Sequence, residues 1–188
     1  MRKINFKAVF IPTISLFIIC LLMTAALAVT NSITSGKIAK NEAQTQQESM
    51  TVVCPEAVSF EEVSETVFKG LDNEGGVVGY AISTVANGYG GQVKVMTGID
   101  VNGEIINIDV YYNDDETPGL GKNTSNESFT SQFSGLLASE TIVVDKDYSG
   151  EGKKVDAVTS STISSRAVVA AVNEATEIYN KEIAGGEQ

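Results

Sequence analysis

The chain has 188 residues, and its 24 acidic side chains outnumber its 13 basic ones, which gives a formal net charge of −11 at pH 7. This balance argues against a nucleic-acid partner, because such a surface repels phosphates. The chain has no histidine and two cysteines, which excludes Ser-His-Asp catalysis, histidine-ligated metals and cysteine-rich iron–sulfur clusters, so electron transfer would need an organic cofactor.

The N-terminal segment predicts a membrane anchor. Residues 1–7 are basic, and residues 8–29 carry no charge, which is long enough for a helix that crosses ~30 Å of hydrocarbon. The positive-inside rule then predicts a single-pass protein of the cell membrane, with residues 1–7 in the cytoplasm and the body outside. A cleaved signal peptide is the alternative, with a cleavage-like site at Ala26-Leu27-Ala28, although its apolar region typically runs only about 7–15 residues.

The segment after the anchor is polar. It has the composition of a helical stalk or tether, expected over residues 30–54, and leads to a single folded domain at residues 55–188. At the start of this domain, Ser59-Phe60-Glu61-Glu62 resembles a capped helix start and predicts a short helix that Gly70 ends. Cys20 and Cys54 fall in separate segments, and both are expected to be free thiols.

The middle of the chain has the alternation of β-strands. Apolar residues alternate over residues 78–82, 93–101 and 106–112. Asn102-Gly103 predicts a type I′ hairpin between the second and third of these strands. A short helix is expected at residues 128–137, and a brief strand follows at residues 142–144.

The last segment predicts an amphipathic helix from Ile163 onward. Together with the strands, it predicts an α+β domain in which helices pack on an antiparallel sheet. Apolar residues at helical spacing form its core-facing side: Ala167, Val168, Ala171, Val172, Ala175, Ile178 and Tyr179.

The turn that leads into this helix, residues 156–165, is rich in hydroxyl side chains. Serine and threonine before a helix are ordinarily caps. The unpaired amides of a first helical turn also form a site that suits a phosphate group. Lys153, Lys154 and Arg166 either carry solvated charges, which is the commoner case, or help to balance such a phosphate.

Residues 156–162 resemble the flavinylation motif of the FMN-binding domains in the G subunit of Rnf electron-transport complexes and in the C subunit of the sodium-translocating NADH:quinone oxidoreductase. The motif of that family begins with Asp and two variable residues. Ser or Thr follows, then a small residue that is usually Ala, and then Thr. The resemblance implies that Thr162 carries FMN through a phosphoester and that Asp156 orders the turn or helps a separate flavin transferase. Thr159, Ser160, where Gly is frequent, and Ser161, where Ala is usual, offer neighbouring hydroxyls.

Two glycine-bearing segments extend the resemblance. Gly88-Tyr89-Gly90-Gly91, the GYGG loop, and residues 116–121, the ETPGLG loop, would by themselves be an ordinary hairpin and a surface turn. In the resembled family the second loop lies against FMN. The resemblance therefore implies cofactor-binding roles for Tyr89, Glu116, Thr117, Gly119, Leu120 and Gly121.

Acidic residues cluster at the start of the ETPGLG loop. Asp114, Asp115 and Glu116 have the oxygen ligands that calcium prefers, but the spacing of an EF-hand is missing. A solvated acidic loop without a metal is therefore expected.

The resemblance implies a covalent-FMN electron-carrier subunit of a membrane-bound, ion-translocating ferredoxin:NAD oxidoreductase of the Rnf type. Its partners would be the other subunits of the complex and the transferase that attaches the flavin, and no residue of the chain would be catalytic by itself. The sequence is also compatible with two alternatives: a stand-alone flavinylated protein outside the cytoplasm, and a cofactor-free, membrane-tethered assembly module.

Overall fold

The computed structural model describes residues 6–187 and divides into two compact units, Met1–Gln44 and Thr45–Gln188. Of the segment expected in the cytoplasm, residues 1–5 lie outside the described residues. The second unit begins at Thr45, earlier than the domain start expected at residue 55, because the last turns of the first helix pack onto the sheet.

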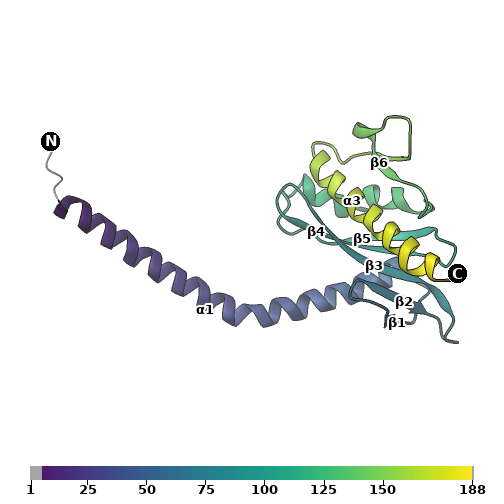
Figure 1. Ribbon diagram of the computed structural model, residues 1–188, viewed down its shortest axis with the longest axis horizontal. Coiled ribbons are helices and arrows are strands. Elements are labelled where there is room, and N and C mark those ends of the chain that lie inside the picture. The colour runs from purple at the N-terminus through teal and green to yellow at the C-terminus, as the bar shows by residue number, and fades with distance from the viewer. Residues whose placement is uncertain (1–5, 188) are drawn as a thin grey trace. The chain divides into compact units, whose positions relative to one another are not determined.

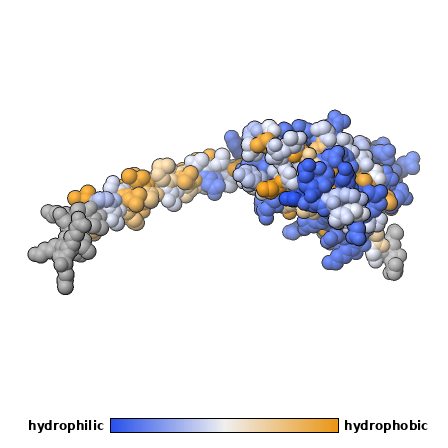
Figure 2. Space-filling model, turned by 90° about the horizontal axis from the view of Figure 1, so that it is seen from above, coloured by the Kyte–Doolittle hydropathy of each residue, from blue (hydrophilic) through white to orange (hydrophobic). Residues whose placement is uncertain are grey.

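The first unit is formed by most of helix α1, which runs Phe6–Val53. By length and composition α1 can cross a membrane, and none of its most apolar stretch is buried within the protein. Apolar side chains gather along this helix in Figure 2. A helix that exposes apolar residues all round is stable where lipid replaces water.

The second unit is built on a five-stranded antiparallel sheet in the order β1-β2-β3-β4-β5. Each strand pairs with the next along the chain (Figure 1), and β6 and β7 form a separate parallel pair. The strand bounds are Ser59–Glu62, Val67–Leu71, Val77–Asn87, Gln92–Ile99, Ile105–Tyr112, Ile142–Val144 and Lys153–Val155.

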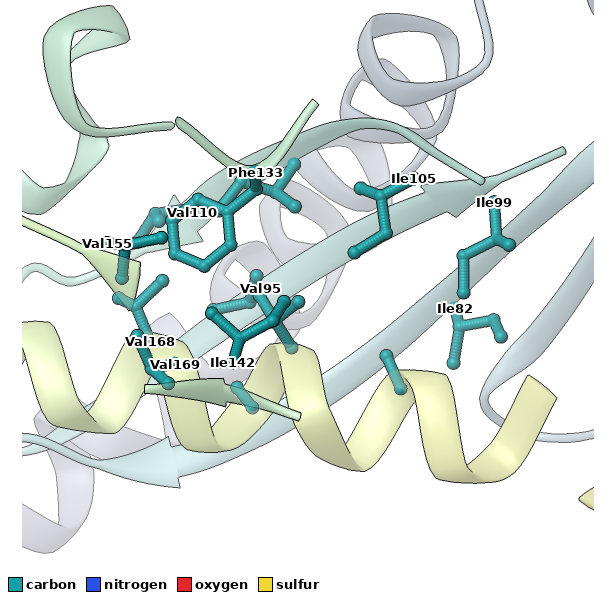
Figure 3. Packing of buried hydrophobic residues seen from close by; sticks show 14 of the residues in the cluster. Ile82, Val95, Ile99, Ile105, Val110, Phe133, Ile142, Val155, Val168 and Val169 are labelled. Atoms are coloured by element: carbon teal, nitrogen blue, oxygen red, sulfur yellow. The ribbon is translucent and has the colours of Figure 1, made fainter. Parts of the chain in front are cut away.

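Helix α3, Thr162–Ile178, covers one face of the sheet. The predicted apolar face is confirmed, since Val168, Ala171 and Val172 are fully buried. Figure 3 shows side chains of the sheet, of α3 and of the β6–β7 pair in one cluster, with Phe133 among them. This core fixes the direction of α3 and therefore the position of its N-terminus.

The opposite face of the sheet is covered by residues 45–53 of α1. Met50, Val53 and Cys54 pack against Ala81 and Met96. A Cβ atom at Gly98 would overlap the Val53 carbonyl, so this glycine lets the helix backbone touch the sheet. Neither cysteine forms a disulfide, and burial raises the pKa of the Cys54 thiol to about 12.

The helix expected after Ser59 is absent, and the prediction was wrong. Residues 59–62 and 67–71 instead form the antiparallel strands β1 and β2. Gly70 lies within β2 against Gly79, and Val67 is fully buried. The burial of apolar residues on both faces of the sheet stabilises strands more than the capping pattern stabilises a helix.

Two further local predictions were also wrong. The turn between β4 and β5 is not type I′, because Gly103 is its only residue with positive φ, and Asp100 Oδ1 accepts hydrogen bonds from the backbone N–H groups of Asn102 and Glu104. The helix expected at residues 128–137 is divided into α2 (Glu127–Thr130) and the 3₁₀-helix η2 (Ser131–Phe133). Gly135, with φ of 81°, turns the chain back onto β5.

Candidate functional site

A cavity of about 430 Å³ lies at the N-terminus of α3. Three segments far apart in sequence line it: Tyr89 of the GYGG loop, four residues of the ETPGLG loop, and residues 160–164. Tyr89, Leu120 and Ile163 all expose apolar surface here. The cavity therefore combines apolar walls with the polar end of a helix.

Glu116 joins the three segments. Its side chain is only 2% exposed. The Oε1 atom accepts hydrogen bonds from the N–H groups of Tyr89 (2.7 Å) and Gly90 (3.3 Å), and the Oε2 atom accepts one from Ser164 Oγ (2.9 Å). One carboxylate therefore holds the GYGG loop and the first turn of α3 against the ETPGLG loop.

Glycines make this contact sterically allowed. A Cβ atom at Gly88 or Gly121 would overlap a carboxylate oxygen of Glu116, and one at Gly90 would overlap the Asp115 carbonyl. The packing around residues 115 and 116 therefore requires glycine at positions 88, 90 and 121.

The N-terminus of α3 has free hydrogen-bonding groups. Ser161 is the N-cap residue, yet its buried Oγ atom has no hydrogen-bond partner among the described residues. The amides of Thr162, Ile163 and Ser164 likewise meet no acceptor in the part of the chain that the structure describes. These donors lie at the positive end of the helix dipole, so the site favours an anion.

Ser160 has a strained backbone. Its φ of 61° is the only positive value among non-glycine residues of the described chain. This is the position at which the resembled motif frequently has glycine, and a left-handed conformation explains that preference.

A second, outer hollow of about 720 Å³ shares Leu120 and Ser160 with the cavity. It is lined by Gly119, Asp156 and Thr159, together with the side chains of Asn123, Asn126 and Gln132. The Asp156 side chain is 75% exposed, and Lys154 Nζ lies 3.6 Å from its carboxylate.

The shape of the turn at Asp156 comes from other side chains. Gln132 accepts a hydrogen bond from Asp156 N (2.7 Å) and donates one to Asp156 O (3.2 Å). Asp145 Oδ1 accepts one from Ala157 N (3.0 Å), which lowers the pKa of Asp145. Backbone contacts therefore order the turn and leave the Asp156 carboxylate facing solvent.

The basic residues near this turn are held in exposed ion pairs. Lys153 pairs with Glu140, and Arg166 binds both carboxylate oxygens of Asp147, which lowers the pKa of Asp147. With Lys154 beside Asp156, these cations match the solvated charges expected from the sequence.

The expectation of a solvated acidic loop holds for only part of it. Asp114 and Asp115 are exposed, and Asp114 pairs with Lys122. For Glu116 the expectation was wrong, because the two glycine loops enclose it. No cluster of possible metal ligands occurs among residues 6–187.

All the residues to which the resemblance gave cofactor-binding or attachment roles line one of the two hollows. Tyr89, Glu116, Thr117, Gly121, Ser161 and Thr162 lie at the inner cavity, Gly119, Asp156 and Thr159 at the outer hollow, and Leu120 and Ser160 at both. The sequence did not point to Ser164, Gln132 or Asp145. Ser164 and Gln132 bind partners that lie 24 or more residues away in sequence, and Asp145 binds one that lies 12 residues away.

Comparison with known proteins identifies the class. Residues 88–177 match the sequence profile of the FMN-binding domain, and residues 1–53 match that of the RnfG N-terminal region. In fold, the chain is similar to the crystal structure of the C subunit of the Na⁺-translocating NADH-quinone reductase from Parabacteroides distasonis, with a TM-score of 0.52 and 22% identity over 61% of this chain and 60% of the other. The protein is thus an FMN-binding-domain protein, and the predicted α+β fold is confirmed.

Proteins that are similar to this chain over nearly its whole length identify its family within this class. The G subunit of the Na⁺-translocating ferredoxin:NAD⁺ oxidoreductase complex of Acetobacterium woodii is 37% identical, with 94% of each chain covered. The G subunit of the proton-translocating complex of Clostridium ljungdahlii is 32% identical, with 91% of each covered. The chain belongs to the family of Rnf complex G subunits.

Proposed function

We propose that this protein is the FMN-carrying electron-transfer subunit of a membrane-bound, ion-translocating ferredoxin:NAD oxidoreductase complex of the Rnf type. Family membership along the whole chain supports this role. The residues present fit the cofactor, since the cavity offers apolar side chains for a ring and free donors for a phosphate. When bound, FMN supplies the electron-accepting and electron-donating chemistry.

The attachment point in this proposal is the Thr162 hydroxyl. The observation that carries it is the position of Thr162, the first residue of α3, in the cavity wall beside free helix amides and the unpartnered Ser161 Oγ. A phosphate esterified at this position would receive hydrogen bonds from the first turn without a paired cation. Asp156, Thr159, Ser160 and Ser161 complete the turn that presents the threonine.

The bond proposed is a phosphoester. A P–O bond forms between Thr162 Oγ and the flavin phosphate, and the hydroxyl proton is lost. The flavin donor is a nucleotide with a phosphoanhydride bond, which breaks and releases the other phosphate-bearing half. The chain has no histidine to activate the hydroxyl, so a separate flavin transferase is the partner that completes this step.

The remaining cavity residues bind and exclude water. Leu120 and Tyr89 offer apolar surface to the isoalloxazine ring, and Gly121 with Thr117 allows the loop backbone to approach it. Glu116 holds this loop in place, and Gly119 turns it with φ of 78°. None of these residues reacts; they fix the position of the ring.

In the cell, α1 anchors the protein in the membrane beside the other subunits of the complex. The proposed orientation has the N-terminus in the cytoplasm and the FMN domain on the other side, as the basic residues 1–7 favour. A covalent bond is useful there, because a free flavin would diffuse away.

Mass analysis of the protein from its native membranes tests the proposal. The intact mass should exceed that of the polypeptide by one esterified FMN, and the addition should lie on the proteolytic peptide that contains Thr162. If that peptide is unmodified and no other peptide carries flavin, the proposal is wrong. Flavin on another peptide would keep the carrier role and move the attachment point.

A further inference from the structure

The most unusual side chain of the inner cavity is Glu116. It is the only acidic residue among the fully buried large side chains of the described chain. Both of its oxygens act as acceptors, for two backbone N–H groups and one hydroxyl. This is the pattern of an ionised carboxylate, which has no proton to donate.

The charge of Glu116 is balanced by dipoles. Among residues 6–187, no lysine or arginine is seen in a salt bridge with Glu116. The Tyr89 and Gly90 amides and the positive end of α3, reached through Ser164, stabilise the carboxylate instead. Hydrogen bonds to a charged group are stronger than neutral ones, so ionisation tightens the contact between the loops.

We infer that Glu116 is a positioning residue whose negative charge holds the cavity in shape through its hydrogen bonds to Ser164 and the GYGG amides. The same charge acts directly, through space, to lower the reduction potential of a flavin bound there. The second effect rests on the proposed function. It follows from Coulomb's law, because adding electrons close to a buried negative charge costs more free energy than adding them in water.

The decisive variant is Glu116→Gln, which keeps the size and one acceptor oxygen but removes the charge. Its matched control is Asp115→Asn, which changes the net charge equally at an exposed neighbouring position. Ser164→Ala is a second variant that keeps the charge and removes the link to α3. All three are made in the full-length chain, purified in detergent.

The first readout is hydrogen exchange of the peptide containing residues 88–91, in protein produced without a flavin transferase. Exchange in Glu116→Gln should be about fivefold faster than in the unaltered chain, because charge-assisted hydrogen bonds become neutral. Ser164→Ala should also exchange faster, and Asp115→Asn should not. Unchanged exchange in both Glu116→Gln and Ser164→Ala would overturn the positioning role.

The second readout is the midpoint potential of the attached flavin, measured by spectroscopic redox titration. Glu116→Gln should shift it upward relative to the unaltered chain, whereas Ser164→Ala and Asp115→Asn should leave it nearly unchanged. An equal shift in Asp115→Asn, or none in Glu116→Gln, would overturn the electrostatic role. If the unaltered chain carries no flavin, the proposed function fails, while the exchange experiment still decides the positioning role.

Discussion

The two hollows on either side of Leu120 and Ser160 are built differently. The inner cavity is closed by a buried carboxylate that glycines allow two loops to reach. The outer hollow is lined by amide side chains and by an Asp156 carboxylate that faces solvent. The inner hydrogen bonds are buried or partly buried, and the outer ones are exposed.

This difference separates two tasks at one helix end. A ring that must keep a fixed position needs the rigid, partly apolar inner cavity. The exposed turn at Asp156 is accessible to another protein, as attachment by a transferase requires. Thr162 lines the inner cavity, so under the proposed function a flavin that a transferase attaches from outside would be held by the inner cavity.

The strongest test of this division replaces the acceptor. Thr162→Val should abolish covalent flavin, because it removes one hydroxyl and leaves the fold intact. Thr159→Val, at the outer hollow, should retain the flavin, and Thr162→Ser should retain it in part. Flavin fluorescence of the denatured protein, after production with a flavin transferase, measures the outcome. Flavin on Thr162→Val in normal amount would assign the attachment to a neighbouring hydroxyl.

The inner cavity should be sensitive to added volume. Gly121→Ala places a methyl group against Glu116 Oε2 and Ser164 Oγ, and overpacking of this kind lowers the free energy of unfolding by about 1–3 kcal/mol. Gly119→Ala is the control, because its Cβ meets open space and only its φ of 78° is unfavourable, at a cost of about 1 kcal/mol. Urea unfolding of the two variants compares them. Equal losses would mean that the inner contact is no tighter than the surface turn.

Substitutions at the outer turn should lower the free energy of unfolding less than substitutions at the inner cavity. Gln132→Ala removes both hydrogen bonds to the Asp156 backbone, which are partly exposed and together contribute about 1 kcal/mol. Hydrogen exchange should increase in the peptide that contains Asp156 and remain unchanged at the GYGG loop. Ser131→Ala, at the exposed neighbouring position, should change neither. Faster exchange at both places in Gln132→Ala would show that the two hollows are coupled.

The sequence predicted most of what surrounds α3. The helix, its buried face and the three motifs that line its N-terminus could be found, because each has a local signal such as periodicity or a glycine pattern. Local signals gave a wrong secondary structure where one segment carries both a helix pattern and a strand pattern. Residues 59–62 have a helix-capping pattern, but Phe60 and Phe68 cover the sheet face opposite α3 only when β1 and β2 are strands.

The burial of Glu116 could not be predicted from its surroundings in sequence. Two exposed aspartates precede it, and the same residue type usually faces solvent. Its burial depends on the close approach of Gly88 to one carboxylate oxygen and of Gly121 to the other, which is a property of the tertiary structure. The contact of Gln132 with Asp156 was missed for the same reason, since neither residue carries a motif that points to the other.

The smallest expected effect concerns acid stability at the outer turn. The backbone N–H of Ala157 and then the neighbouring Lys146 lower the pKa of Asp145 below its ordinary value of 3.8. Because the folded-state pKa is the lower one, the stabilisation is complete above about pH 4 and is lost as the pH falls through the folded-state value.

Asp145→Asn removes this titration but keeps an oxygen that can accept the Ala157 hydrogen bond. In urea unfolding between about pH 5 and pH 2, the variant should therefore lose less stability than the unaltered chain. Asp147 also has a lowered pKa, through its contact with Arg166, so Asp147→Asn is measured beside it to separate the two contributions. If Asp145→Asn follows the unaltered chain throughout this range, the Asp145 carboxylate does not stabilise the turn. Order in the turn would then come from the hydrogen bonds of Gln132 to the Asp156 backbone and from the one that Val158 N donates to Ser165 Oγ.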